Sequence, residues 1–143
     1  MANEALVNEI KSNGGEAIFV VTDVSKTKDV ERMVETAEKN YGSIDIAVNN
    51  AGIEGTPGIR TADFVEDVWD EVMDINLKGV WLSMKYEIPV MLKAGGGNII
   101  NISSLAGLKG RGAGTAYQLK FGVDQKATIK KWHATLIVEL YAY

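Results

Sequence analysis

Residues 44–52 read IDIAVNNAG, a largely apolar run that passes directly into two asparagines, an alanine and a glycine. A short run of this kind predicts a strand buried on both faces, as in a parallel sheet. Residues 17–24 (AIFVVTDV) and 98–102 (NIINI) predict two further strands. These strands alternate with helix-forming stretches, so we expect an α/β fold with a doubly wound, Rossmann-like parallel sheet.

Three stretches show the apolar spacing of amphipathic helices. Each is followed by glycines that favour a helix end, at residues 14–15, 42 and 95–97. Pro89 is expected to kink the last turns of the third helix. A glycine-rich loop over residues 107–114 leads into a fourth helix. The expected helices are residues 2–12, 28–41, 67–93 and 115–140.

Bulk properties restrict the classes of function. The 143 residues suit one domain over 1–143, and a formal charge of −4 with interleaved acids and bases argues against nucleic-acid and membrane-surface binding. The chain has no cysteine and a single histidine, His133, which argues against a metal site and a serine-histidine-acid triad. No signal peptide or membrane span is indicated. We expect a soluble, cytoplasmic protein with a small-molecule partner.

Ligands of such sheets bind beyond the carboxyl ends of the strands. A phenol is a useful acid there only if a nearby cation lowers its pKa from about 10. Tyr117 and Lys120 are three residues apart, which makes them neighbours on a helix. With the Ser104 hydroxyl holding a carbonyl oxygen, they predict general acid catalysis of carbonyl reduction. The full set near this edge is Asp23, Asn49, Asn50, Ala51, Gly52, Asn76, Ser104, Tyr117 and Lys120.

Several short motifs follow the predicted strands at characteristic places: TDV at 22–24, NNAG at 49–52, INLKGV at 75–80 and NISS at 101–104. Tyr117 then follows Ser104 at the spacing usual for one enzyme family. On these motifs, residues 2–123 resemble the short-chain dehydrogenases/reductases, in particular the 3-oxoacyl-carrier-protein reductase and glucose dehydrogenase type.

The resemblance implies an NAD or NADP cofactor and a role for each matching residue. Ser104 would position the substrate carbonyl and Tyr117 would exchange the proton. Asn76 would support a water and lysine relay, with Lys120 also holding the nicotinamide ribose beside Tyr117. Asn49 would brace the sheet. The remaining contacts would be to the adenine from Asp23 and Val24, and to the adenosine ribose from Asn50, Ala51 and Gly52.

The chain departs from the family pattern in three respects. The family's first strand, its glycine-rich TGxxxGxG turn and its second strand are not found in these residues. In the family's sheet order the two missing strands lie between residues 17–24 and 44–48, so we expect a partial sheet with a central gap. The lysine stands three residues after Tyr117 instead of four. After Val123 the tail differs, and the later strands are expected to be missing.

Three functions remain open. The leading hypothesis is an oxidoreductase that transfers a hydride between NAD or NADP and an alcohol or carbonyl substrate. A second is a catalytically silent truncated fragment that acts through helix-mediated subunit association. A third is another Rossmann-like nucleotide binder, which would use residues 49–52 and leave Ser104 and Tyr117 without a role. A homo-oligomer is expected to form through the helices at 67–93 and 115–140.

Overall fold

The computed structural model describes residues 2–104 and 135–139. Helices and strands alternate along the chain, as expected for the α/β class. None of the helices within residues 2–104 has the length and apolar character needed to span a membrane. In chain order the elements are α1 (Ala2–Ser12), α2 (Thr27–Tyr41), β1 (Ile46–Asn49), η1 (Thr61–Asp63), α3 (Glu66–Met73), η2 (Asp74–Lys78), α4 (Gly79–Lys93), β2 (Asn98–Ser104) and β3 (Thr135–Glu139).

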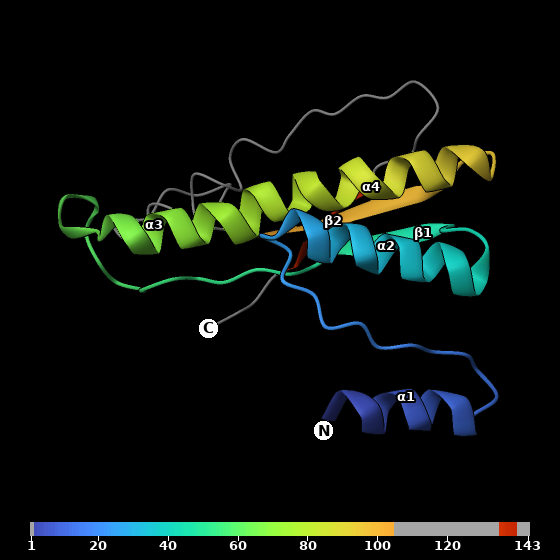
Figure 1. The fold of residues 1–143 in the computed structure, drawn as a ribbon. Helices are drawn as coiled ribbons and strands as arrows, with labels where there is room; N and C mark the ends of the chain where they lie inside the picture. Colours follow the sequence, from blue (N-terminus) through green and yellow to red (C-terminus); the bar gives the residue numbers. More distant parts are fainter. Residues whose placement is uncertain (1, 105–134, 140–143) are drawn as a thin grey trace.

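The three described strands form one parallel sheet in the order β1–β2–β3 (Figure 1). Val48 is paired with Ile100, and Ile102 is paired with Ile137. The sheet confirms the predicted fold class. It also confirms the strands predicted at 44–48 and 98–102, with small shifts of their ends.

β3 was not anticipated. The prediction of a helix over 115–140 is wrong for Thr135–Glu139, and a further strand does follow β2. The sequence TLIVE is rich in β-branched and apolar residues, which favour a strand where a neighbouring edge is available, and β2 provides that edge. The rest of the predicted helix lies outside the described residues.

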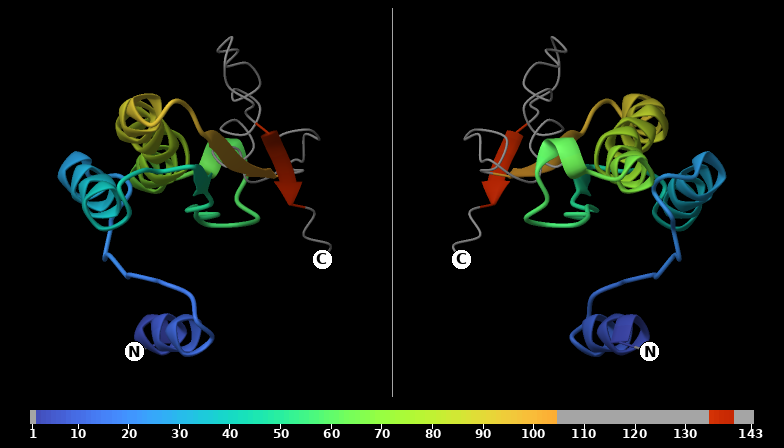
Figure 2. Two further views of the ribbon diagram at one scale, coloured as in Figure 1. Left: turned by 90° about the vertical axis from the view of Figure 1, so that its right-hand side faces the viewer. Right: turned by 90° about the vertical axis from the view of Figure 1, so that its left-hand side faces the viewer.

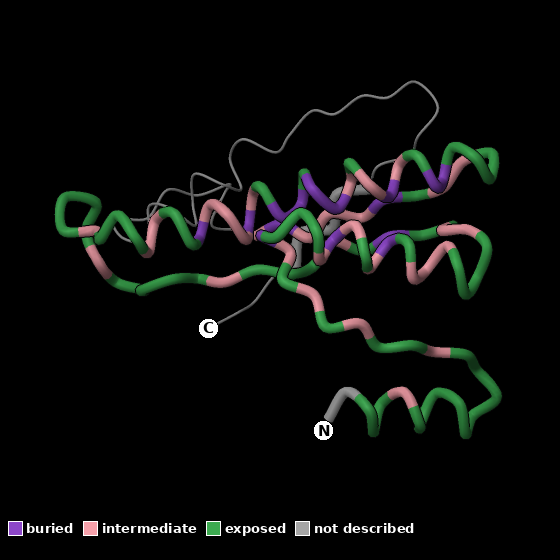
Figure 3. Tube along the Cα trace, in the orientation of Figure 1, coloured by how far each residue is buried: buried purple, intermediate pink, exposed green. Residues whose placement is uncertain are grey.

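Residues 17–24 form no strand in the structure, so that prediction is also wrong. Ile18, Phe19 and Val21 are exposed, Val21 to 73%, along a segment that runs from α1 to α2 (Figure 3). A strand needs hydrogen bonds from a neighbour. β1 does not supply them here, which agrees with a sheet that lacks the two strands expected between this segment and β1. β1 is therefore an edge strand of the described sheet.

α2 and α4 lie side by side, and α4 packs against β1 on one face of the sheet (Figures 1 and 2). On the other face of β1, Ile46 and Val48 are exposed. α1 lies apart from the sheet (Figure 2). The prediction that this strand is buried on both faces is therefore wrong. The buried centre on the helical face consists of Ala47, Ile99 and Met91, packed against Ile44, Met84 and Ile88.

The predicted helices at 2–12, 28–41 and 67–93 are confirmed. α2 ends at Tyr41 and is followed by Gly42, whose φ of 82° is the left-handed conformation that glycine favours. α3, η2 and α4 form one continuous helix, and Pro89 lies inside its last part. η2 is a π-helical turn, a feature often found at functional sites.

Candidate functional site

The carboxyl ends of β1 and β2 define the candidate site. β1 ends at Asn49 and continues into the exposed residues 50–52, which we call the 50–52 loop. β2 ends at Ser104, three residues beyond Asn101, the register partner of Asn49. Asn49 and Ser104 therefore end neighbouring parallel strands at the same edge, as predicted. Tyr117 and Lys120 lie outside the described residues.

Asn76 holds the downstream end of the 50–52 loop. Its side chain is fully buried in η2, where its Oδ1 accepts a hydrogen bond from the Ile53 N–H at 2.8 Å. Its Nδ2 donates to the Ile53 carbonyl at 2.7 Å. The amide thus pairs with both polar groups of one residue, as a strand neighbour would. A Cβ on Gly52 would lie 3.3 Å from the Asn76 Oδ1, so this approach favours glycine.

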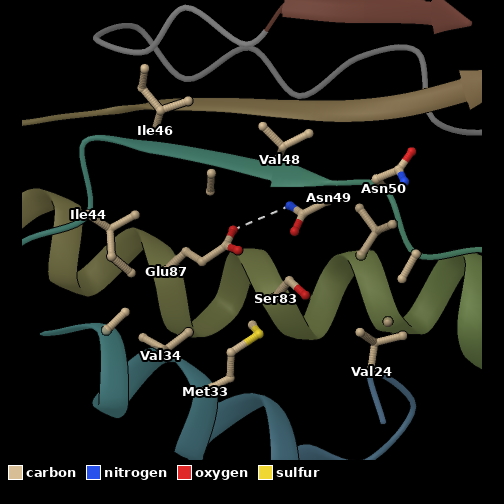
Figure 4. Close-up of a pocket in the computed structure, with 15 residues that line it drawn as sticks. Val24, Met33, Val34, Ile44, Ile46, Val48, Asn49, Asn50, Ser83 and Glu87 are labelled. Carbon is tan, nitrogen blue, oxygen red and sulfur yellow. Dashed lines mark hydrogen bonds between the residues drawn. The ribbon is translucent and has the colours of Figure 1, made fainter. Parts of the chain in front are cut away.

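Asn49 holds the upstream end of the loop. Its Nδ2 donates to the Asn101 Oδ1 at 3.0 Å. It also donates to the Glu87 Oε2 at 3.3 Å (Figure 4). The Asn101 amide in turn lies 3.5 Å from the Met84 sulfur. These contacts join β1 to both β2 and α4, so Asn49 braces the sheet as the resemblance implies.

Glu87 is the residue of this region that sequence reasoning missed. Only 5% of it is exposed, and removal from water raises the pKa of its carboxyl group, against the lowering effect of the hydrogen bond from Asn49. One signal in the sequence could have found it. An acidic residue stands among the apolar positions Leu82, Val90 and Met91 of α4, all of which are buried.

Glu87 lies in an open groove of about 340 Å³ between α2, α4 and β1 (Figure 4). The groove is mostly apolar and is the place where Val24, Asn50 and Ala51 come together. Three of the predicted cofactor contacts therefore line one concave surface. Its other lining residues are Met33, Val34, Ala37, Ile44, Ile46, Ala47, Val48, Asn49, Gly79, Val80 and Ser83.

Asp23 and Val24 are held where the chain enters α2. The Asp23 Oδ1 accepts hydrogen bonds from the Ser25 hydroxyl at 2.7 Å and the Ser25 N–H at 2.9 Å, and these bonds lower the pKa of Asp23. The Asp23 N–H donates to the Asp29 Oδ2 at 3.0 Å. Val24 packs so closely on α4 that a Cβ on Gly79 would come within 2.8 Å of its Cγ2. The position of Val24 thus requires glycine at 79.

A known protein family covers most of the chain. The family model described as short chain dehydrogenase matches residues 1–134. The chain belongs to the short-chain dehydrogenase family. The predicted family membership is confirmed, and the match continues past Val123, where the family pattern was expected to end. Members of this family bind NAD or NADP.

Individual relatives show how much of the family fold is present. An uncharacterized oxidoreductase of Listeria monocytogenes is 41% identical over 114 residues, which are 80% of this chain and 45% of the relative. A 3-oxoacyl-[acyl-carrier-protein] reductase of Synechocystis is 44% identical over 110 residues, 76% of this chain and 43% of the relative. The crystal structure of an NAD+-bound xylitol dehydrogenase matches with a TM-score of 0.78 and 30% identity, over 83% of this chain and 45% of that one. The chain spans less than half the length of these relatives.

Proposed function

We propose that the chain carries the catalytic edge of an oxidoreductase that transfers a hydride between NAD or NADP and an alcohol or carbonyl compound. The observation that carries the proposal is the exposed 50–52 loop, which is held at both ends and lies at the same sheet edge as Ser104. A loop that is fixed in this way can meet a ligand without first having to be ordered.

The described residues fit one part of a dinucleotide. Val24, Asn50 and Ala51 line one groove, and Gly52 leaves the backbone open beside Asn76. Asp23, Val24, Asn50, Ala51 and Gly52 would hold the adenosine half of the cofactor. The bound cofactor supplies or accepts the hydride. In this family a glycine-rich turn holds the pyrophosphate, and that turn is not found in the 143 residues.

The proton chemistry would come from this chain's own side chains. Ser104 would hold the substrate oxygen, and Tyr117 would give a proton to it or take one from it. Lys120 would lower the pKa of Tyr117 and contact the nicotinamide ribose. Asn76 would support the relay, although both ends of its side-chain amide are already bonded to Ile53. Its contribution would therefore be largely to position the loop.

A second candidate function is association with another subunit by a catalytically inactive chain. Trp81 and Leu92 of α4 are each more than half exposed, and large exposed apolar side chains of this kind favour contact with another protein. A homo-oligomer that uses the 67–93 helix is part of this proposal. A cytoplasmic location remains a prediction.

Titration with NADH and with NADPH, followed by tryptophan fluorescence, tests the cofactor site. Saturable binding of either is expected, and no response to both would refute the oxidoreductase proposal for this chain. With an alcohol or carbonyl substrate, Tyr117→Phe should abolish turnover while the far-ultraviolet circular dichroism stays unchanged. An unaltered rate would remove Tyr117 from the mechanism.

A further inference from the structure

We propose that Glu87 is a positioning residue, which fixes the 50–52 loop by holding the Asn49 side chain against α4. The inference rests on the proposed function only for the role of the 50–52 loop, which is predicted to contact the cofactor. The placement of the loop itself is independent of any ligand.

The loop lies between two side-chain contacts to the same long helix. Asn76 of η2 holds Ile53 on the downstream side, through bonds of 2.8 and 2.7 Å. Upstream, Glu87 of α4 accepts from Asn49 at 3.3 Å. Because η2 and α4 are continuous, one rigid element sets the positions of both ends.

The Asn49 amide nitrogen has two hydrogens, and Glu87 and Asn101 accept one each. Asn101 alone would tie Asn49 to β2 but leave the second hydrogen without an acceptor. An unpaired donor in a partly buried place costs free energy, so the side chain would turn toward other partners or toward solvent. The residue that begins the loop would then lose its fixed orientation.

An apolar side chain would fill the space occupied by Glu87 at a lower desolvation cost. The presence of a glutamate at this buried position is instead accounted for by the hydrogen-bond acceptor that its carboxyl group gives to Asn49. Glutamine at this position would keep an acceptor oxygen, whereas leucine would not. This difference separates a positioning role from simple filling of space.

The charge on Glu87 should affect the strength of this contact. The groove is also lined by residues of α2 and β1. These are Met33, Val34 and Ala37 of α2, and Ile46, Ala47, Val48 and Asn49 of β1. Among the described residues that line the groove, Glu87 is thus the sole titratable group. The carboxylate is a stronger acceptor than the protonated acid. The Asn49 amide should therefore be held more firmly as the pH rises through the pKa of Glu87.

Nuclear magnetic resonance of the full chain tests the proposal without a cofactor. The Asn49 side-chain amide signals should titrate in the natural protein, and Glu87→Gln should abolish that titration. Glu87→Leu should lower the backbone order parameters of residues 50–52 from about 0.85 to below about 0.6, and Glu87→Gln should restore them. Val34→Ala is the matched control: it removes buried volume from the same groove and should leave the order parameters unchanged.

The affinity for NADH is a second, separate measurement. Glu87→Leu should weaken it by about tenfold, as expected for one lost hydrogen bond to a buried group, and Glu87→Gln should not. If even the natural chain binds no NADH, the proposed function fails while the resonance experiment still decides the role of Glu87. Asn49 signals that do not titrate, or a loop that stays ordered in Glu87→Leu, would overturn the positioning role. If Glu87→Leu does not fold, the titration of the natural protein and of Glu87→Gln decides.

Discussion

Replacement of Asn76 by alanine should lower the free energy of unfolding by about 2.5 kcal/mol. The side chain is fully buried and bonds both the N–H and the carbonyl group of Ile53. Leaving two partly buried backbone groups without partners costs about 1.5 kcal/mol each. Alanine is the better helix former and returns about 0.5 kcal/mol. The net loss is a large fraction of the stability of a domain of this size.

The measurement is urea unfolding of the natural protein and the variant, followed by far-ultraviolet circular dichroism. Asn40→Ala provides the matched control, because it removes the same amide from an exposed site where Asn40 bonds the Thr36 carbonyl. That control should change the stability by no more than about 0.5 kcal/mol. If Asn76→Ala is no less stable than Asn40→Ala, the two bonds to Ile53 do not hold the loop, and the reasoning is wrong.

Two further experiments test the anchoring of the chain before α2. Gly79→Ala should destabilise the protein by about 1–3 kcal/mol, because the added Cβ would come within 2.8 Å of Val24. A second substitution, Val24→Ala, should recover part of this loss. A double-mutant cycle of urea unfolding midpoints measures the recovery. Asp23→Asn should reduce the loss of stability in acid. The bonds from Ser25 hold the pKa of Asp23 below the ordinary value of an aspartate. The charged form therefore contributes stability above that ordinary value, and this contribution disappears as the pH falls through the lowered pKa. Equal acid unfolding curves for the two proteins would contradict this account of Asp23.

Local patterns were sufficient to predict α2 and the helix over 66–93, because the apolar spacing of a helix is contained within its own residues. They failed for residues 17–24, whose composition suits a strand but whose partners are absent from the described sheet. For Thr135–Glu139 the opposite happened: the neighbouring edge of β2 determined the structure. Strand formation depends on distant residues, which a local pattern does not contain.

The residues of the candidate site could likewise be predicted only in part from local patterns. Asn76 could be predicted because an amide inside a helix is unfavourable unless it serves a purpose, and the structure shows that purpose in the pairing with Ile53. In the sequence Glu87 stands out only as an acidic residue among apolar positions, since its burial and its contact with Asn49 are seen only in the folded structure. Both depend on how α4 packs on β1, which is a property of the folded chain.

The uncovered side of β1 has a practical consequence for anyone who handles this protein. An edge strand next to exposed Ile46 and Val48 can recruit strands from other molecules in solution. Recruitment of this kind depends on how often molecules meet, so melting temperatures and scattering measured at one dilution will not carry over to another. Biophysical comparisons between variants should therefore be made across a concentration series, with sedimentation to report the size of the species present.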